Sequence, residues 1–343
     1  MSAVLTCRCT KPPPTAAGIV QGHSATLSDP FAMPGVDHLL RWIRQARSMA
    51  VSCQSMRTSR ANSLLGYGDD ARLLIVNADD FGMSEAVNEA VLGSIKQGVV
   101  CSTSLMVPWP GAAQAMQMLR ENPEIDFGVH LSVICDMPRC RAGPVAPLEA
   151  VSSLVDESGR FYGEERRAEF VARSKLGELE VEFRSQIEAV VSAGLQPTHL
   201  DWHCLADGGR PDVFDMTLGL AKDHGLALRV HDGLSIPNLQ SQGLPTNDHD
   251  VLDSFSLDPV GKSERYVKML RDLPVGLTEW AVHPALDGPE LRELEPDGWP
   301  VRHTDYEFLV SAEARETIEE EGIVLLSHEP LRRVWATDSS QLH

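Results

Sequence analysis

The sequence predicts an α/β fold in which a parallel sheet curls into a distorted, TIM-like (β/α) barrel of about seven strands. From Leu73 onward, short apolar, β-branched runs alternate with helix-like segments. Such alternation is typical of parallel strands joined by right-handed helical crossovers. Seven units over about 260 residues suit a closed or distorted barrel. An open doubly wound sheet is the alternative, but no glycine-rich phosphate motif follows the first apolar run.

The composition excludes several classes of partner. The chain has 343 residues, 43 % of them apolar, and a formal net charge of −19. An acidic chain repels phosphate backbones, so nucleic acid is not an expected partner. No run approaches the roughly 18 apolar residues of a membrane span, so a membrane is not expected either. Seven cysteines without a CxxC pair indicate reduced thiols and a cytoplasmic location.

The first 70 residues differ in composition and charge from the rest of the chain. They are rich in Ser, Thr, Pro and Gly, and residues 1–72 hold eight Lys/Arg against four Asp/Glu. Such a composition does not bury a core. We therefore expect a disordered or weakly structured extension over residues 1–70, with one short amphipathic helix at Val36–Ala50, and a barrel domain over residues 71–335.

The elements of the barrel follow in order. Strands are expected at residues 73–80, 101–107, 126–133, 197–203, 226–232, 277–285 and 323–329. Helices are expected between them at residues 84–98, 112–123, 178–194, 212–225, 263–273 and 311–322. Ser84 is the expected N-cap of the first helix. Residues 139–163 are expected to be rich in loops.

Polar side chains follow most of these apolar runs, at the strand ends where barrel active sites lie. Asn77, Asp79 and Asp80 follow the first run, and the fourth and sixth bring Asp201 and Glu279. Six of the 12 histidines also stand at strand exits: His130, His199, His203, His231, His283 and His328. Because such exits are a small share of the chain, this placement predicts one shared polar pocket.

Two histidines and a carboxylate on separate strands suit Zn²⁺ or another divalent cation, with positions open for water and substrate. A second carboxylate beside the first can take the proton of a bound water. The Asp79–Asp80 pair supplies both groups. Taken alone, an Asp-Asp pair is more often turn chemistry, and His130 alone is more often a core histidine.

The run LLIVNADDFGMSEAVNEAV, at residues 73–91, resembles the opening of the YdjC-like carbohydrate deacetylases. Five further segments resemble the family pattern in order: VCSTSLMV, FGVHLSV, PTHLDWH, GLALRV and the His-Pro of AVHPA. The resemblance extends roughly from Leu73 to Glu329. It implies a distorted TIM-like barrel and removal of N-acetyl groups from an amino sugar or oligosaccharide.

The resemblance also implies roles for individual residues. Asp80, His130 and His203 match the metal ligands, and Mg²⁺ or Zn²⁺ is the implied cation. Asp79 matches the catalytic base. His283 matches the general acid that protonates the departing amine.

On the substrate side, Arg229 and Trp202 are candidate contacts with the sugar. Arg229 is equally explained by a structural ion pair, and Trp202 by packing. The chain departs from the family pattern at Trp202 and at residues 204–210. A carbohydrate is the expected partner, and a homodimer is left open. Hydrolysis of another acyl substrate such as an ester, or sugar binding without catalysis, are the alternative functions.

Overall fold

The computed structural model describes residues 60–137 and 142–339. The main sheet has eight strands, and each pairing within it is parallel. Its strands are β1 (Arg72–Phe81), β2 (Ser102–Leu105), β3 (Phe127–Leu131), β6 (His199–Trp202), β7 (Ala227–Leu228), β8 (Leu252–Asp253), β9 (Gly276–Val282) and β10 (Val324–Leu325). The seven predicted strands are thus all present, and β8 is an eighth that the sequence did not reveal.

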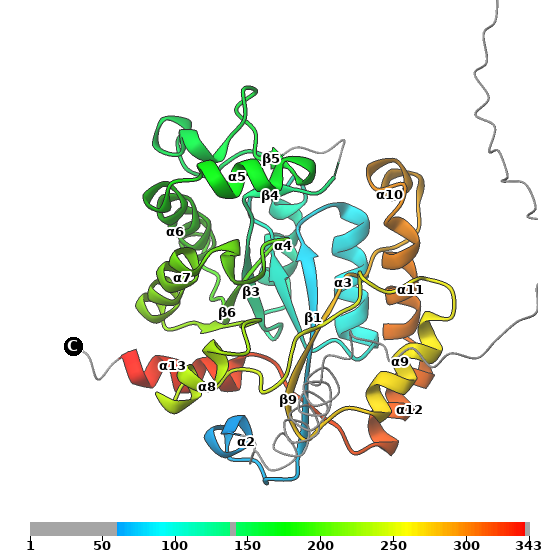
Figure 1. Ribbon diagram of the computed structural model, residues 1–343. Helices are drawn as coiled ribbons and strands as arrows, with labels where there is room; N and C mark the ends of the chain where they lie inside the picture. The colour runs from blue at the N-terminus through cyan, green and yellow to red at the C-terminus, as the bar shows by residue number, and fades with distance from the viewer. Residues whose placement is uncertain (1–59, 138–141, 340–343) are drawn as a thin grey trace, which may run out of the picture. The chain divides into compact units, whose positions relative to one another are not determined.

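The strands are ordered β7-β6-β3-β2-β1-β9-β8, with β10 paired to the start of β1. β9 pairs with one edge of β1 over residues 72–78, so β10 and β2 share the other edge at different heights. The sheet curls like part of a barrel, and helices cover its outer side (Figure 1). The parallel α/β prediction is confirmed. No pairing between β7 and β8 closes the sheet within the described residues.

The helices lie on both flanks of the curled sheet, with α6 and α7 on one side and α3 and α11 on the other (Figure 1). Their bounds are α2 (Arg60–Leu65), α3 (Glu85–Gln97), α4 (Ala112–Glu121), α5 (Arg167–Arg173), α6 (Leu176–Ser192), α7 (Pro211–His224), α8 (Ser235–Ser241), α9 (Lys262–Arg271), α10 (Pro289–Leu294), α11 (Trp299–Leu309), α12 (Ala312–Glu320) and α13 (Glu329–Ser339). Ser84 caps α3, accepting a hydrogen bond from the Val87 amide, as predicted.

Six of these helices have no counterpart among the predicted ones: α2, α5, α8, α10, α11 and α13. For α11 the reason is physical. α11 follows a Gly298-Trp299-Pro300 segment, and such residues are typical of turns. Here Pro300 occupies the first turn of the helix, where its missing N–H has no intrahelical partner to lose. The segment 139–163, expected to be rich in loops, contains β5 (Tyr162–Gly163), which forms a small parallel pair with β4 (Ile134–Cys135).

Part of the segment expected to be disordered or weakly structured is folded. α2 and the turn after it lie within residues 1–70, yet Ala61 and Asn62 are fully buried. The Asn62 side chain donates to the carbonyls of Gly68 and Ala71, at 2.9 Å each. Residues 1–59, with the helix expected at Val36–Ala50, lie outside the described residues.

A continuous apolar core joins the sheet to its helices. It includes Leu73, Leu74 and Val76 of β1, and Trp280 of β9, all with 0–1 % exposure. Among the described residues, no helix is both long and apolar enough to cross a bilayer.

Candidate metal and active site

The site begins with an irregularity at the end of β1. The register of β1 against β2 shifts between Ala78 and Phe81, and Asp80 has a left-handed backbone with φ 67°. A side-chain-bearing residue seldom adopts this conformation, and such strain is concentrated at functional sites. In a regular strand, consecutive side chains point to opposite faces. The bulge instead lets both Asp79 and Asp80 approach His130, as their contacts show.

Asp80, His130 and His203 converge from the ends of β1, β3 and β6, of which β3 and β6 are paired and β1 is separated from β3 by β2. The Asp80 Oδ1 atom lies 3.4 Å from His130 Nε2 and 3.2 Å from His203 Nδ1. One ligand atom from each of the three residues lies within 4.8 Å of the others. All three side chains are at most 4 % exposed. The structure thus brings together three residues that the sequence analysis places in one pocket.

A carboxylate stands behind each of the two imidazoles. His130 Nδ1 lies 2.8 Å from Asp201 Oδ1, and His203 Nε2 lies 3.1 Å from Asp136 Oδ1. Such carboxylates fix the tautomer and orientation of metal-binding histidines. Burial lowers the pKa of His130, but the charges and hydrogen bonds of Asp201, Asp80 and Asp79 together outweigh burial and raise the pKa to about 9. The site therefore attracts positive charge.

Asp79 is held by Arg229. The two Nη atoms of Arg229 donate to the two carboxylate oxygens of Asp79, at 2.7 and 2.8 Å. Asn77 Nδ2 adds a hydrogen bond to Asp79 Oδ1 at 2.7 Å. Burial raises the pKa of Asp79, but the charge and hydrogen bonds of Arg229 outweigh burial, so the pKa falls well below its usual 3.8. Asp79 is therefore ionised throughout the neutral range.

Arg302 is a functional candidate that the sequence did not reveal. This α11 side chain is 1 % exposed, and its Nη1 donates to Asp80 Oδ2 at 2.8 Å while its Nε donates to Glu295 at 2.5 Å. One oxygen of Asp80 is thereby fixed, and the other points at the two imidazoles. Nothing in the local sequence predicts that a helix beginning at Trp299 reaches the end of β1.

His283, the expected general acid, follows β9 at the edge of this group. Its Nδ1 lies 2.9 Å from Ser254 Oγ, and its side chain is 14 % exposed. The charge of His283 is among the causes that lower the pKa of Asp79, which places the two side chains in one electrostatic environment.

Arg229 and Trp202 occupy positions that do not suit contact with a sugar. Arg229 is 2 % exposed, and its nitrogens contact carboxylates of Asp79, Asp201 and Glu279 at 2.6–3.1 Å. Trp202 is 4 % exposed and packs on Phe214 of α7, with 6.2 Å between ring centroids. Because side chains alternate along β6, Trp202 points away from the Asp201 side. The ion-pair and packing alternatives therefore describe these two residues.

The other strand-exit histidines divide into two groups. His199 and His328 stack with 3.5 Å between ring centroids, and His328 Nε2 lies 3.4 Å from Glu279. They connect to the site through Glu279 and Arg229. Gly128 makes room for this pair, since a Cβ there would lie 2.5 Å from the His199 ring. His231 instead faces Asp207 at 3.6 Å, so it does not join the shared pocket.

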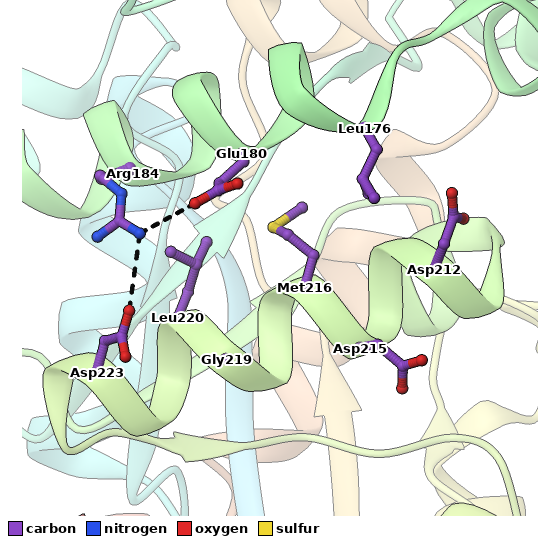
Figure 2. A pocket seen from close by; sticks show the side chains of 9 residues that line it. All are labelled: Leu176, Glu180, Arg184, Asp212, Asp215, Met216, Gly219, Leu220 and Asp223. Carbon is purple, nitrogen blue, oxygen red and sulfur yellow. Dashed lines mark hydrogen bonds and ion pairs between the residues drawn. The ribbon is translucent and has the colours of Figure 1, made fainter.

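A surface groove of about 540 Å³ lies elsewhere, between α6 and α7. Figure 2 shows Arg184 of α6 in contact with Glu180 of the same helix and, across the groove, with Asp223 of α7. None of the candidate catalytic or metal-binding residues lines this groove.

Replacing Arg229 by Met tests the ion-pair network. The change leaves three buried carboxylates without their shared counter-charge, so we expect the free energy of unfolding at pH 7 to fall by about 3–5 kcal/mol. The Arg229 charge lowers the pKa of Asp79, and that of Glu279 to about 2. The stabilisation is therefore fully present above their ordinary values of 3.8 and 4.5 and is lost progressively as the pH falls from these values toward the folded-state pKa, which is about 2 for Glu279.

Urea unfolding at several pH values measures this effect. The difference between wild type and Arg229→Met should be largest at neutral pH and should narrow as the pH falls through 4.5, the ordinary pKa of Glu279. Arg333→Met is the control, because Arg333 is 74 % exposed and pairs with Glu329; its loss should stay below about 1 kcal/mol. Equal stability of Arg229→Met and wild type at pH 7 would contradict the interpretation.

Two carbohydrate deacetylases are similar in sequence to this chain. A carbohydrate deacetylase of Geobacillus stearothermophilus is 34 % identical over 215 residues, covering 62 % of this chain and 80 % of that protein. A carbohydrate deacetylase of Enterococcus faecalis (strain ATCC 700802 / V583) is 32 % identical over 270 residues, covering 75 % and 97 %.

A solved structure and a family model agree with these relatives. The 1.70 Å crystal structure of a protein from Enterococcus faecalis V583, described as a cellobiose-phosphate cleavage protein, superposes with a TM-score of 0.66 at 30 % identity. The superposition covers 76 % of this chain and 99 % of the other. The family model described as YdjC-like protein matches residues 73–320. The chain therefore belongs to the YdjC-like family.

Proposed function

We propose that the protein is a metal-dependent hydrolase that removes an N-acetyl group from an amino sugar or oligosaccharide. The observation that carries this proposal is the convergence of Asp80, His130 and His203, with the ionised Asp79 beside them. Membership of the YdjC-like family supports it, as do relatives named carbohydrate deacetylases.

The three converging residues fit a cation. Asp80 Oδ1 is buried, and it has no hydrogen-bond partner among the described residues although two imidazole nitrogens face it. A bound cation would satisfy this oxygen together with His130 and His203. One carboxylate and two imidazoles suit Zn²⁺ or a similar transition metal better than Mg²⁺, which prefers oxygen ligands.

The remaining residues supply proton transfer. A divalent cation held by these residues would make water a stronger acid and would polarise the acyl carbonyl. The Asp79 carboxylate accepts the proton of the attacking water, and Arg229 keeps it ionised and oriented. His283 gives a proton to the amine nitrogen as the C–N bond breaks, because an unprotonated amine leaves poorly.

Phe255 is a better candidate than Trp202 for contact with the sugar. Among the large apolar residues exposed in the described parts of the chain, it is the aromatic one, with 37 % exposure. Its ring centroid lies 5.4 Å from that of His283, and the Arg302 guanidinium lies 5.2 Å from it. An aromatic face at this position can bury the apolar face of a sugar ring beside the proposed acid. A homodimer and a cytoplasmic location stay predictions.

Metal binding can be measured without activity. Isothermal titration of metal-stripped protein with Zn²⁺ should show one tight site, and His130→Ala should lose it. Asp201→Asn should weaken binding by about 10–100-fold, the usual worth of a carboxylate behind a histidine ligand. His231→Ala, at a strand exit outside the cluster, should bind like wild type. Unchanged Zn²⁺ affinity in His130→Ala would contradict the assigned site.

Asp79→Asn tests the base. We expect it to keep bound metal and a near-normal KM while kcat for acetate release from N-acetylated sugars falls about 10²–10⁴-fold. Asp232→Asn is the control, because among the described contacts the Asp232 side chain accepts hydrogen bonds only from Leu234 and Ser235 of its own turn. Near-wild-type turnover by Asp79→Asn would remove Asp79 from the mechanism. Faster acetate release from O-acetylated than from N-acetylated sugars would favour an esterase. Sugar binding without any acetate release would favour a binding protein.

Phe255→Ala tests the sugar-binding face. KM for N-acetylated sugars should rise roughly 2- to 12-fold, the equivalent of an aromatic contact, while kcat changes little. Phe255→Tyr should retain the wild-type KM. Leu234→Ala removes an 84 % exposed apolar side chain and should leave KM unchanged. An unaltered KM in Phe255→Ala would place the sugar elsewhere.

A further inference from the structure

A chain of hydrogen bonds lies behind His283, and none of the proton transfers proposed above uses it. Ser254, directly after β8, places its Oγ 2.9 Å from His283 Nδ1 and 2.5 Å from Asp305 Oδ2. The same Asp305 oxygen accepts the backbone N–H of His283 at 2.9 Å. Ser254 and Asp305 are fully buried. Asp305 thus fixes both the backbone and, through Ser254, the ring of His283.

The direction of these hydrogen bonds follows from chemistry. The other oxygen of Asp305 accepts from Lys262 Nζ at 2.6 Å and from Tyr266 at 2.5 Å, which is the environment of an ionised carboxylate. An ionised carboxylate only accepts, so the single hydroxyl proton of Ser254 goes to Asp305. The Ser254 oxygen is then left to accept, and His283 Nδ1 must carry the proton.

We propose that Ser254 and Asp305 are positioning residues that hold His283 as its Nδ1–H tautomer and leave Nε2 as the nitrogen that delivers the proton. This inference rests on the proposed function. During the reaction the Nε2–H bond breaks, the proton passes to the amine nitrogen, and imidazolium becomes the neutral Nδ1–H ring. No proton moves along the chain to Asp305, and no further reactant is needed.

The charge balance supports positioning rather than charge stabilisation. Lys262 lies against Asp305 and is 2 % exposed, so the pair is close to neutral. The other carboxylate near the ring nitrogen, Asp253, is half exposed and 3.9 Å away. The main effect of Ser254 is therefore the orientation and tautomer of the ring. Because α11 carries both Arg302 and Asp305, one helix turn holds the metal-ligand carboxylate and the proton donor.

The tautomer can be measured in the resting enzyme, independently of any activity. ¹⁵N–¹H spectra of histidine-labelled protein with a neutral His283 ring should show a protonated Nδ1 and an unprotonated Nε2, with the signal assigned by its loss in His283→Gln. In Ser254→Ala the tautomer should shift toward Nε2–H. A wild-type His283 in the Nε2–H form would overturn the proposal even if the protein is an active deacetylase.

Kinetics give the second readout. In Ser254→Ala, kcat for N-acetylated sugars should fall about 2- to 12-fold, the equivalent of one hydrogen bond, while an acetyl ester with a good leaving group should be cleaved at the wild-type rate. Ser254→Thr, which keeps the hydroxyl, should restore amide turnover. Ser94→Ala removes a buried hydroxyl without a hydrogen-bond partner among the described residues and should change neither rate. Equal losses on amide and ester in Ser254→Ala would show a merely structural role.

Discussion

The interaction on which the site depends is the burial of one guanidinium among three carboxylates. Arg229 follows β7, and its partners Asp79, Asp201 and Glu279 belong to β1, β6 and β9. A single charged group therefore ties four strands of the sheet together at its polar interior. Buried carboxylates are costly without such a partner, and the same contact fixes the protonation of Asp79. Stability and the proposed base are thus two consequences of one ion-pair network.

A second layer orients the groups that would meet metal and substrate. Asp201 and Asp136 stand behind the two imidazoles of the cluster, and α11 supplies Arg302 and Asp305 one turn apart. Each proposed reactive group has a hydrogen-bonding or ion-pair partner that limits its rotation. Preorganisation of this kind costs nothing at the moment of reaction.

The sequence predicted the site residues that stand at the ends of successive strands. Parallel strands end at one side of the sheet, so Asp80, His130 and His203 could be assigned to one pocket from their places after apolar runs, and the family resemblance pointed to the same three. Burial of Trp202 and Arg229 could not be read in this way, because their environments depend on residues far along the chain. Arg302 and Asp305 were hidden by the turn-like Gly298-Trp299-Pro300 segment. Ser254 follows a strand of two residues, too short to give a periodic signal.

Anomalous diffraction from crystals of the Zn²⁺-loaded protein, collected at the zinc edge, tests the central claim most directly. The account predicts one strong peak bounded by the side chains of Asp80, His130 and His203. Asp136, His203 and Cys204 form another group whose atoms lie within 4.8 Å of one another. A peak there instead, or no ordered peak in protein that holds one equivalent of zinc, would contradict the account.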